Sequence, residues 1–219
     1  MPIPLILFVA AASPALALVA ALTTRGRPQP APVRWMLLWC VLLLISDALF
    51  LFAAFTVGQN LALLPVLVPA SSAAALWALS GWQPNDFLRL TYRLTIVALL
   101  VATAVLLFTL RPGPLFDQFL APLHNLVVLA AALHTLVHRT LIEESPITRE
   151  DWFWITLGMS LYFAASVAVR PFAQATVATH PDWVRAAYEV RAGITTLAFT
   201  LVAWGIAWPT YRRRFGGQS

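Results

Sequence analysis

The sequence contains no lysine, a single cysteine and few charged residues of any kind. Only 11% of its 219 residues are charged, whereas soluble domains contain about a quarter. The chain is 60% hydrophobic, with a mean hydropathy of +0.79. So little polar surface cannot cover a water-exposed globule, and the composition therefore predicts an integral membrane protein.

The missing lysines exclude two kinds of cofactor chemistry. All fourteen basic residues are arginines, but retinal pigments and pyridoxal enzymes both attach their cofactor to a lysine amine. The lone Cys40 cannot form an internal disulfide, a C-x-x-C redox pair or a thiolate metal site, and we interpret it as a buried or lipid-facing apolar side chain. The net charge of +5 is scattered between apolar runs, which favours membrane orientation over nucleic-acid binding.

Seven apolar runs approach the roughly 20 residues that a helix needs to cross the hydrocarbon core. Segments containing Pro, Gly, Asn or acidic residues separate them. We expect an all-α integral membrane protein, a seven-transmembrane-helix bundle forming one membrane domain over residues 1–219, with no soluble or output domain. The predicted spans are 3–22, 35–57, 60–80, 88–110, 117–139, 152–172 and 185–208.

The arginines predict how the bundle is oriented. Ten lie on the side that holds the C-terminus and four on the other side, which places the C-terminus in the cytoplasm and the N-terminus outside. The first run is followed, not preceded, by Arg25 and Arg27, so we expect a retained first span rather than a signal peptide. The expected location is a bacterial inner membrane.

The fifth predicted span carries three histidines: His124, His134 and His138. The fourteen residues from His124 to His138 place both on nearly one helix face, about 21 Å apart. This spacing resembles the histidine pairs of b-type cytochromes, a resemblance that implies two haems and four imidazoles. The only other histidine is His180, in a loop, so one haem or chlorophyll-type pigment on His124 or His138 is the alternative left open. No metal site and no cofactor are predicted otherwise, because the H-E-x-x-H pattern is absent.

Asp47 is a carboxylate placed deep in the second predicted span. It follows Arg34 by 13 residues, which is about 20 Å along a helix. An unpaired carboxylate at that depth costs several kcal/mol, so we expect it to face the bundle interior and to have a partner.

The predicted order and direction of the spans place further polar residues in the outer half of the bundle. One interpretation is structural: Arg170 and Glu189 form an interfacial ion pair, and Asp47 bonds to a neighbouring hydroxyl. The other is an outward-opening pocket for a small ligand. Its candidate residues are Asp47, His124, Asn125, Tyr162, Arg170, Glu189 and Arg191.

Three functions are compatible with this sequence. The first is a non-catalytic sensor-like module or accessory subunit that acts through a membrane partner or a homo-oligomer, since the topology resembles that of rhodopsins and of seven-span bacterial sensor modules. Its contact surfaces would be the "HRTLIEESPITRED" loop, where we expect Thr148 to cap a helix, and the "YRRRFGGQS" tail. The second is a haem- or pigment-binding electron-transfer subunit. The third is a lipid-modifying enzyme similar in length to lysoplasmalogenase-like proteins, with Asp47, His124 and Glu189 as acid–base groups.

Overall fold

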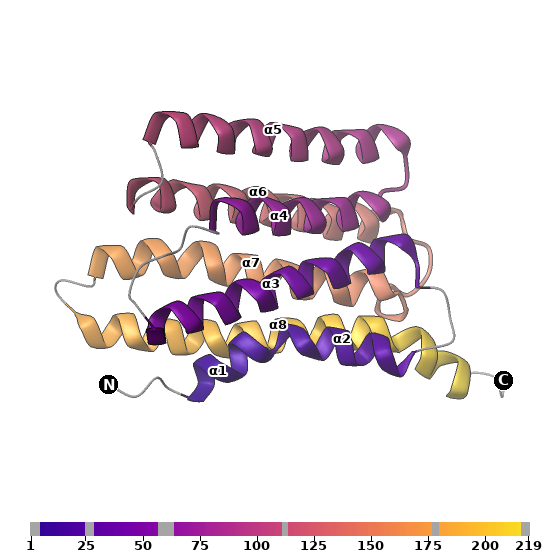
Figure 1. Cartoon of the computed structure of the whole chain (residues 1–219). Coiled ribbons are helices and arrows are strands. Elements are labelled where there is room, and N and C mark those ends of the chain that lie inside the picture. Colours follow the sequence, from indigo (N-terminus) through magenta and orange to yellow (C-terminus); the bar gives the residue numbers. More distant parts are fainter. Residues whose placement is uncertain (1–4, 25–28, 57–63, 111–113, 177–179, 216–219) are drawn as a thin grey trace. The chain divides into compact units, whose positions relative to one another are not determined.

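The computed structural model describes residues 5–24, 29–56, 64–110, 114–176 and 180–215. These residues form helices, and none of them lies in a strand (Figure 1). In chain order the elements are α1 (Leu5–Ala12), α2 (Pro14–Thr23), α3 (Ala31–Thr56), α4 (Leu64–Gly81), α5 (Asp86–Leu110), α6 (Pro114–Ile142), the short 3₁₀ helix η1 (Ile147–Arg149), α7 (Asp151–Thr176) and α8 (Pro181–Phe215).

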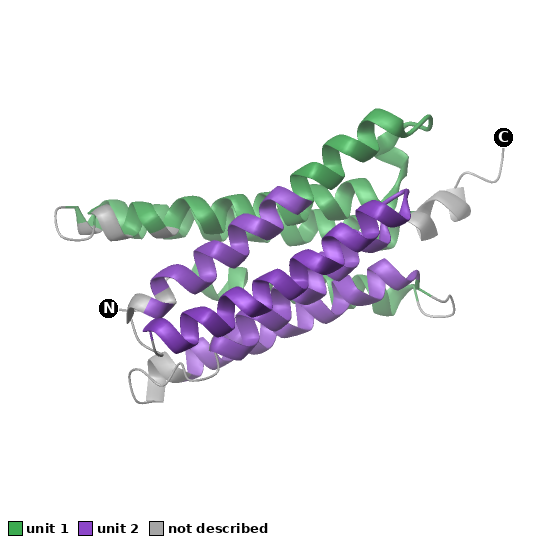
Figure 2. Cartoon of the chain, turned by 90° about the horizontal axis from the view of Figure 1, so that it is seen from above, with its two compact units in different colours: residues 1–29, 132–219 green, residues 30–131 purple. Residues whose placement is uncertain are grey.

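The chain divides into two compact units (Figure 2). Unit 1 comprises residues 1–29 and 132–219, and unit 2 comprises residues 30–131. Helix α6 contributes its first part to unit 2 and its last part to unit 1.

Several helices are long and apolar enough to cross a membrane. Within the described residues there are five such helices, namely α3, α5, α6, α7 and α8, and six if the bent pair α1 and α2 forms one span. Helix α4 is apolar but shorter. The predictions of an all-helical protein and of several membrane-length helices are confirmed, and the structure is compatible with a multi-pass membrane protein.

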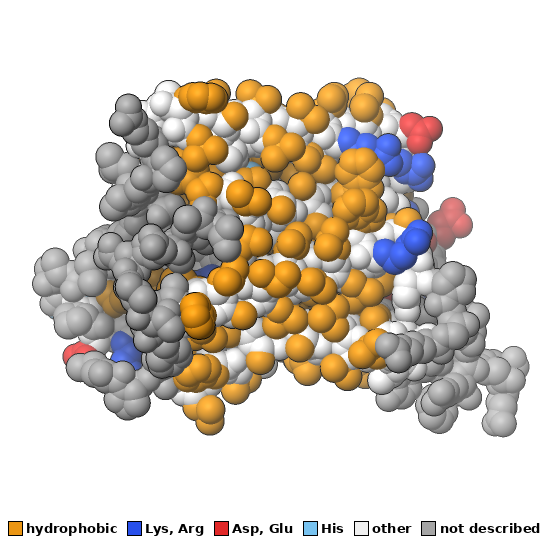
Figure 3. All heavy atoms as spheres, viewed as in Figure 1, with side chains coloured by type: hydrophobic (Ala, Val, Ile, Leu, Met, Phe, Trp, Pro, Cys, Tyr) orange, Lys and Arg blue, Asp and Glu red, His pale blue; other side chains and the backbone are white. Residues whose placement is uncertain are grey.

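One face of α5 carries exposed apolar side chains along most of the helix. Its large apolar side chains recur every three or four residues and are more than half exposed, as a helix facing hydrocarbon requires. They are Leu90, Leu94, Val97, Val101, Val105 and Phe108. In Figure 3 apolar side chains cover this helix along its length, and charged side chains gather at the end where it begins. This face is therefore suited to lipid rather than to water.

In unit 2, helix α4 packs against both α3 and α5. Small residues allow the close approach of α3: a Cβ atom added to Gly81 would lie 2.5 Å from Cγ of Pro32. The α4 side chains Leu76 and Leu79 are fully buried. The start of α3 and the end of α4 therefore meet at one end of unit 2.

In unit 1, helices α7 and α8 pack closely against each other. A Cβ atom on Gly158 would lie 2.5 Å from the carbonyl oxygen of Ala198, and one on Gly205 would lie 2.7 Å from Cγ1 of Ile155. Helix packing in membranes depends on such small residues, because they bring two backbones into van der Waals contact. Helices α1 and α2 pack on α8.

The first predicted span is broken in two. Helices α1 and α2 meet at an angle of 43°, because Pro14 has no N–H with which to bond the carbonyl of Ala10. Ser13 bonds that carbonyl instead, through its backbone nitrogen at 3.1 Å and its hydroxyl at 2.7 Å. The break therefore leaves the Ala10 carbonyl satisfied.

Candidate functional site

His124 is fully buried in unit 2 and connects two of its helices. Its Nε2 lies 2.9 Å from Oγ1 of Thr103 on α5. The Thr103 hydroxyl donates to the carbonyl oxygen of Leu99 at 2.9 Å. A hydroxyl has only one proton to donate, so its oxygen accepts the Nε2–H of the imidazole. The neutral ring therefore carries its proton on Nε2.

The other ring nitrogen of His124 is a buried acceptor. Nδ1 has no hydrogen-bond partner among the described residues, and in this tautomer it keeps a lone pair. A buried acceptor without a partner costs free energy. Nδ1 is therefore a position that could accept a hydrogen bond from a donor group of a ligand. No three His, Cys, Asp or Glu side chains of the described residues lie together as a metal site would need.

The other α6 histidines lie in unit 1, one to two turns before the end of the helix. The rings of His134 and His138 stack, with centroids 5.5 Å apart. His134 is exposed and His138 is half-buried. They form a pair of their own, far along α6 from His124.

Two further candidate residues of unit 2 are half-buried. Asp47 on α3 takes part in a hydrogen-bonding or electrostatic interaction, so it is not a free carboxylate. Asn125 follows His124 on α6 and is also half-buried. A second polar bridge joins α5 to α6, since the Tyr92 hydroxyl donates to the carbonyl of Ala131 at 2.9 Å.

In unit 1 the candidate residues make contacts mostly within α7 and α8. Arg191 donates to the hydroxyl of Ser166 at 3.3 Å, and that hydroxyl donates to the carbonyl of Tyr162. Glu189 is bonded to Arg185, four residues earlier on its own helix, at 2.9 Å. Arg191 and Tyr162 are thus connected through Ser166, while Glu189 is occupied by a neighbour on α8.

The candidate residues of the predicted pocket are divided between the two units. Asp47, His124 and Asn125 belong to unit 2, and the remaining candidates belong to unit 1. The side chain of Arg170 lies outside the described part of the structure. Sequence reasoning missed Thr103 and Ser166, because a hydroxyl in an apolar helix carries no signal of the direction in which it points.

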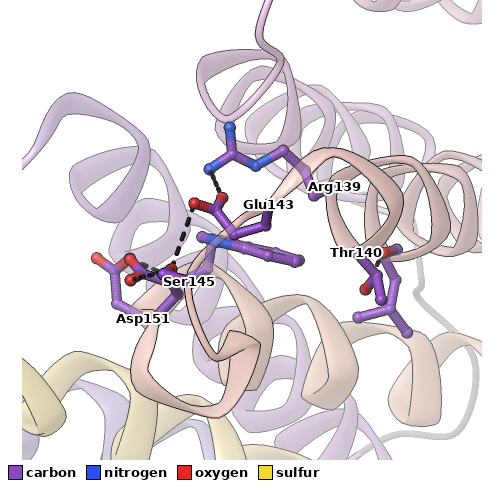
Figure 4. A network of polar contacts seen from close by, with 8 residues as sticks. Arg139, Thr140, Glu143, Ser145 and Asp151 are labelled. Carbon is purple, nitrogen blue, oxygen red and sulfur yellow. Dashed lines mark hydrogen bonds and ion pairs between the residues drawn. The ribbon is translucent and has the colours of Figure 1, made fainter.

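A second polar site lies at the α6–α7 connection, which we define as residues 143–150 (Figure 4). Arg139 on α6 is bonded to Glu143 at 2.8 Å, and its guanidinium lies 5.2 Å from the ring centre of Trp152. The Ser145 hydroxyl lies between two carboxylates, 3.0 Å from Glu150 and 3.4 Å from Glu143. Its single proton favours the shorter contact.

The same connection is fastened to α7 and α8 by tryptophans. The indole nitrogen of Trp154 on α7 donates to the carbonyl of Thr148 at 2.9 Å. The indole nitrogen of Trp208 on α8 donates to the carbonyl of Arg149 at 3.0 Å. Both carbonyls belong to η1, which occupies the place where a helix cap at Thr148 was predicted. That prediction is wrong, because α7 begins at Asp151, whose carboxylate accepts from the backbone nitrogen of Trp152.

Arg139→Gln is expected to loosen the α6–α7 connection. Both side chains of its pair with Glu143 are 23% exposed, so removing the charge should lower the free energy of local opening by about 1 kcal/mol. The amide hydrogens of residues 143–150 should then exchange roughly fivefold faster. Hydrogen–deuterium exchange by mass spectrometry measures this effect. Arg185→Gln removes a more exposed pair of the same spacing and serves as the control. Equal exchange in both variants would contradict the assignment.

No protein-family model, curated protein or solved structure matches this chain.

Proposed function

We propose that this chain is a non-catalytic seven-span membrane protein that acts as a sensor-like module or accessory subunit through a partner in the membrane. The N-terminus lies outside and the C-terminus in the cytoplasm. In this proposal α1 and α2 together make the first crossing, and α4 makes the third. The excess of arginines on the C-terminal side supports the orientation.

One observation carries the proposed function: the α6–α7 connection is attached to three helices at once. Arg139 attaches it to α6, Trp154 to α7 and Trp208 to α8. Glu144, Pro146, Thr148 and Arg149 remain exposed on it. The connection is therefore a pre-ordered polar surface at the end of apolar helices, as a docking surface for another protein requires.

Through this attachment, a movement of the membrane helices would change the shape of the exposed α6–α7 connection. A shift of α8 along α7 would carry Trp208 away from the carbonyl of Arg149. The η1 turn would then lose one of its two indole donors and change shape. A ligand or partner that binds one arrangement better than the other would shift the equilibrium between them. Sensing and docking thus use the same few hydrogen bonds.

The test is site-directed photo-crosslinking from Glu144 in cells that express the full chain. We expect a discrete adduct, either to a second protein or to a second copy. Trp208→Phe should reduce its yield several-fold, since phenylalanine keeps the ring but cannot donate a hydrogen bond. Trp183→Phe is the matched control, because Trp183 lies on the same helix and is 57% exposed. Absence of any adduct, or an equal yield in Trp208→Phe, would overturn the proposal.

The unpartnered Nδ1 of His124 is the observation that favours the second candidate, a haem- or pigment-binding subunit. Against it, the ring is fully enclosed and its Nε2 is already bonded to Thr103. The visible absorbance spectrum of the purified protein distinguishes the two candidates. A Soret or chlorin band would replace the first proposal by the second.

A further inference from the structure

Three helices of unit 2 each contribute one side chain to a continuous row of contacts between two aromatic rings and a cation. The rings of Trp35 on α3 and Trp77 on α4 have centroids 5.4 Å apart. The guanidinium carbon of Arg93 on α5 lies 4.8 Å from the ring centre of Trp77. Cation–π contacts of this length fix the position of a guanidinium without neutralising its charge.

A groove lies beside Trp35. It is lined by Arg34, Trp35 and Leu38, is open to the outside, and has a volume of about 340 Å³. Its lining combines a cation, an aromatic ring and an aliphatic side chain.

The positive charge at this place is not compensated by carboxylates. Neither Arg34 nor Arg93 makes an ion pair with another described residue, and both are exposed. Arg89 nearby on α5 differs, because Asp86 binds it at 3.1 Å. Each of the two contacting tryptophans thus has an arginine beside it, Arg34 next to Trp35 and Arg93 over Trp77. Arginine beside tryptophan is a combination that can bind a phosphate group at the level of lipid headgroups.

Arg34, Trp77 and Arg93 lie near the ends of their helices, at the level expected for lipid headgroups. Arg34 is the fourth residue of α3, and Trp77 precedes the end of α4 by four residues. Arg93 lies about 10 Å along α5 from the helix start, which a long side chain can span toward the surface. The contact between Gly81 and Pro32 holds the ends of α3 and α4 at one level.

An apolar path leads away from the groove along α3. Its exposed apolar side chains continue on one helix face at intervals of three, four or seven residues, in the direction of the membrane interior. They are Trp35, Leu38, Ile45, Leu49 and Phe52. An acyl chain could therefore follow α3 while the phosphate remains beside the arginines.

We propose that this end of unit 2 is a binding site for an anionic phospholipid. Arg34 and Arg93 bind the phosphate, the rings of Trp35 and Trp77 lie at the glycerol level, and an acyl chain follows Leu38 and Ile45 along α3. The site goes beyond the proposed function. It rests on that proposal in one respect only, because the proposed orientation decides which leaflet the site faces. In the proposed orientation it faces the cytoplasmic leaflet, where a negative surface potential attracts basic clusters.

The experiment is native mass spectrometry of the full chain after exchange into detergent that contains phosphatidylglycerol or phosphatidylcholine with the same acyl chains. We expect selective retention of phosphatidylglycerol. Arg34→Gln and Arg93→Gln should each weaken retention about fivefold, since one arginine near a membrane surface contributes an effect of that size. Arg93→Lys keeps the charge and should retain the lipid within about twofold of the parent protein.

Arg185→Gln is the matched control, because it removes one arginine of unit 1 that already has an acidic partner. Its phosphatidylglycerol retention should equal that of the parent protein. All variants are checked by thermal unfolding, and Arg34→Gln changes an exposed side chain that makes no ion pair with a described residue. Equal retention of the two lipids by the parent protein, or unchanged retention by the double glutamine variant, would overturn the site. An acidic protein segment that binds there in place of lipid would do the same.

Discussion

Gly158→Leu is expected to destabilise unit 1 strongly. Even the first added carbon would lie 2.5 Å from the carbonyl oxygen of Ala198 and 2.8 Å from a methyl group of Val202. A backbone oxygen cannot rotate away as a flexible side chain can, so α7 and α8 must separate. Overfilling a packed site costs about 1–3 kcal/mol, and we expect the upper end of this range here.

Gly193→Leu provides the comparison for this result. Gly193 lies on α8, and no atom of the described residues stands within 4 Å of its added Cβ. Its substitution should leave the free energy of unfolding almost unchanged. Thermal unfolding in detergent, followed by tryptophan fluorescence, measures both variants. If the two leucine variants unfold at the same temperature, the close packing of α7 on α8 at Gly158 is wrong.

His124→Ala is expected to cost about 2–4 kcal/mol of unfolding free energy, because it opens a cavity in a fully buried position. His124→Leu should cost much less. It fills the space, and it removes the unpartnered Nδ1 together with the bond to Thr103. The Thr103 hydroxyl keeps its own acceptor, the carbonyl of Leu99, so no new unsatisfied donor arises.

Unfolding measurements on the two variants separate a packing role from a binding role. A small loss in His124→Leu and a large loss in His124→Ala indicate that the imidazole mainly fills space. A large loss of unfolding free energy in both variants would indicate that the imidazole makes a binding interaction that leucine cannot make. The visible spectrum of His124→Leu adds an independent readout, since any bound pigment that depends on the imidazole would disappear from it.

Hydropathy located several of the helices, because a run of apolar residues must be helical where no water can bond its backbone. The predicted spans 88–110 and 152–172 lie within α5 and α7. The observed helices are longer at one or both ends, since hydrogen bonds continue past the apolar stretch into polar residues. The predicted span 3–22 is divided between α1 and α2, although Pro14 was visible in the sequence. The first residues of the predicted span 60–80 lie outside the described part of the chain.

The contacts of the candidate residues were harder to predict, because they depend on the rotation of each helix about its own axis. Span lengths and charges constrain only the position along the membrane normal. Nothing in the sequence directs Thr103 rather than Thr95 or Thr109 toward His124. The loop "HRTLIEESPITRED" was predicted as a contact surface, but its anchoring by Trp208 involves a residue 59 positions away from Arg149.

The 43° angle between α1 and α2 has a consequence for how the first segment behaves. A proline bend in hydrocarbon usually exposes a carbonyl that attracts water or a neighbouring hydroxyl. Here Ser13 supplies that hydroxyl from the adjacent position, and both Ser13 and Pro14 are buried. The carbonyl freed by the bend is therefore satisfied within the segment itself, without help from another helix. The two halves of the segment can change direction at Pro14 and still both pack on α8.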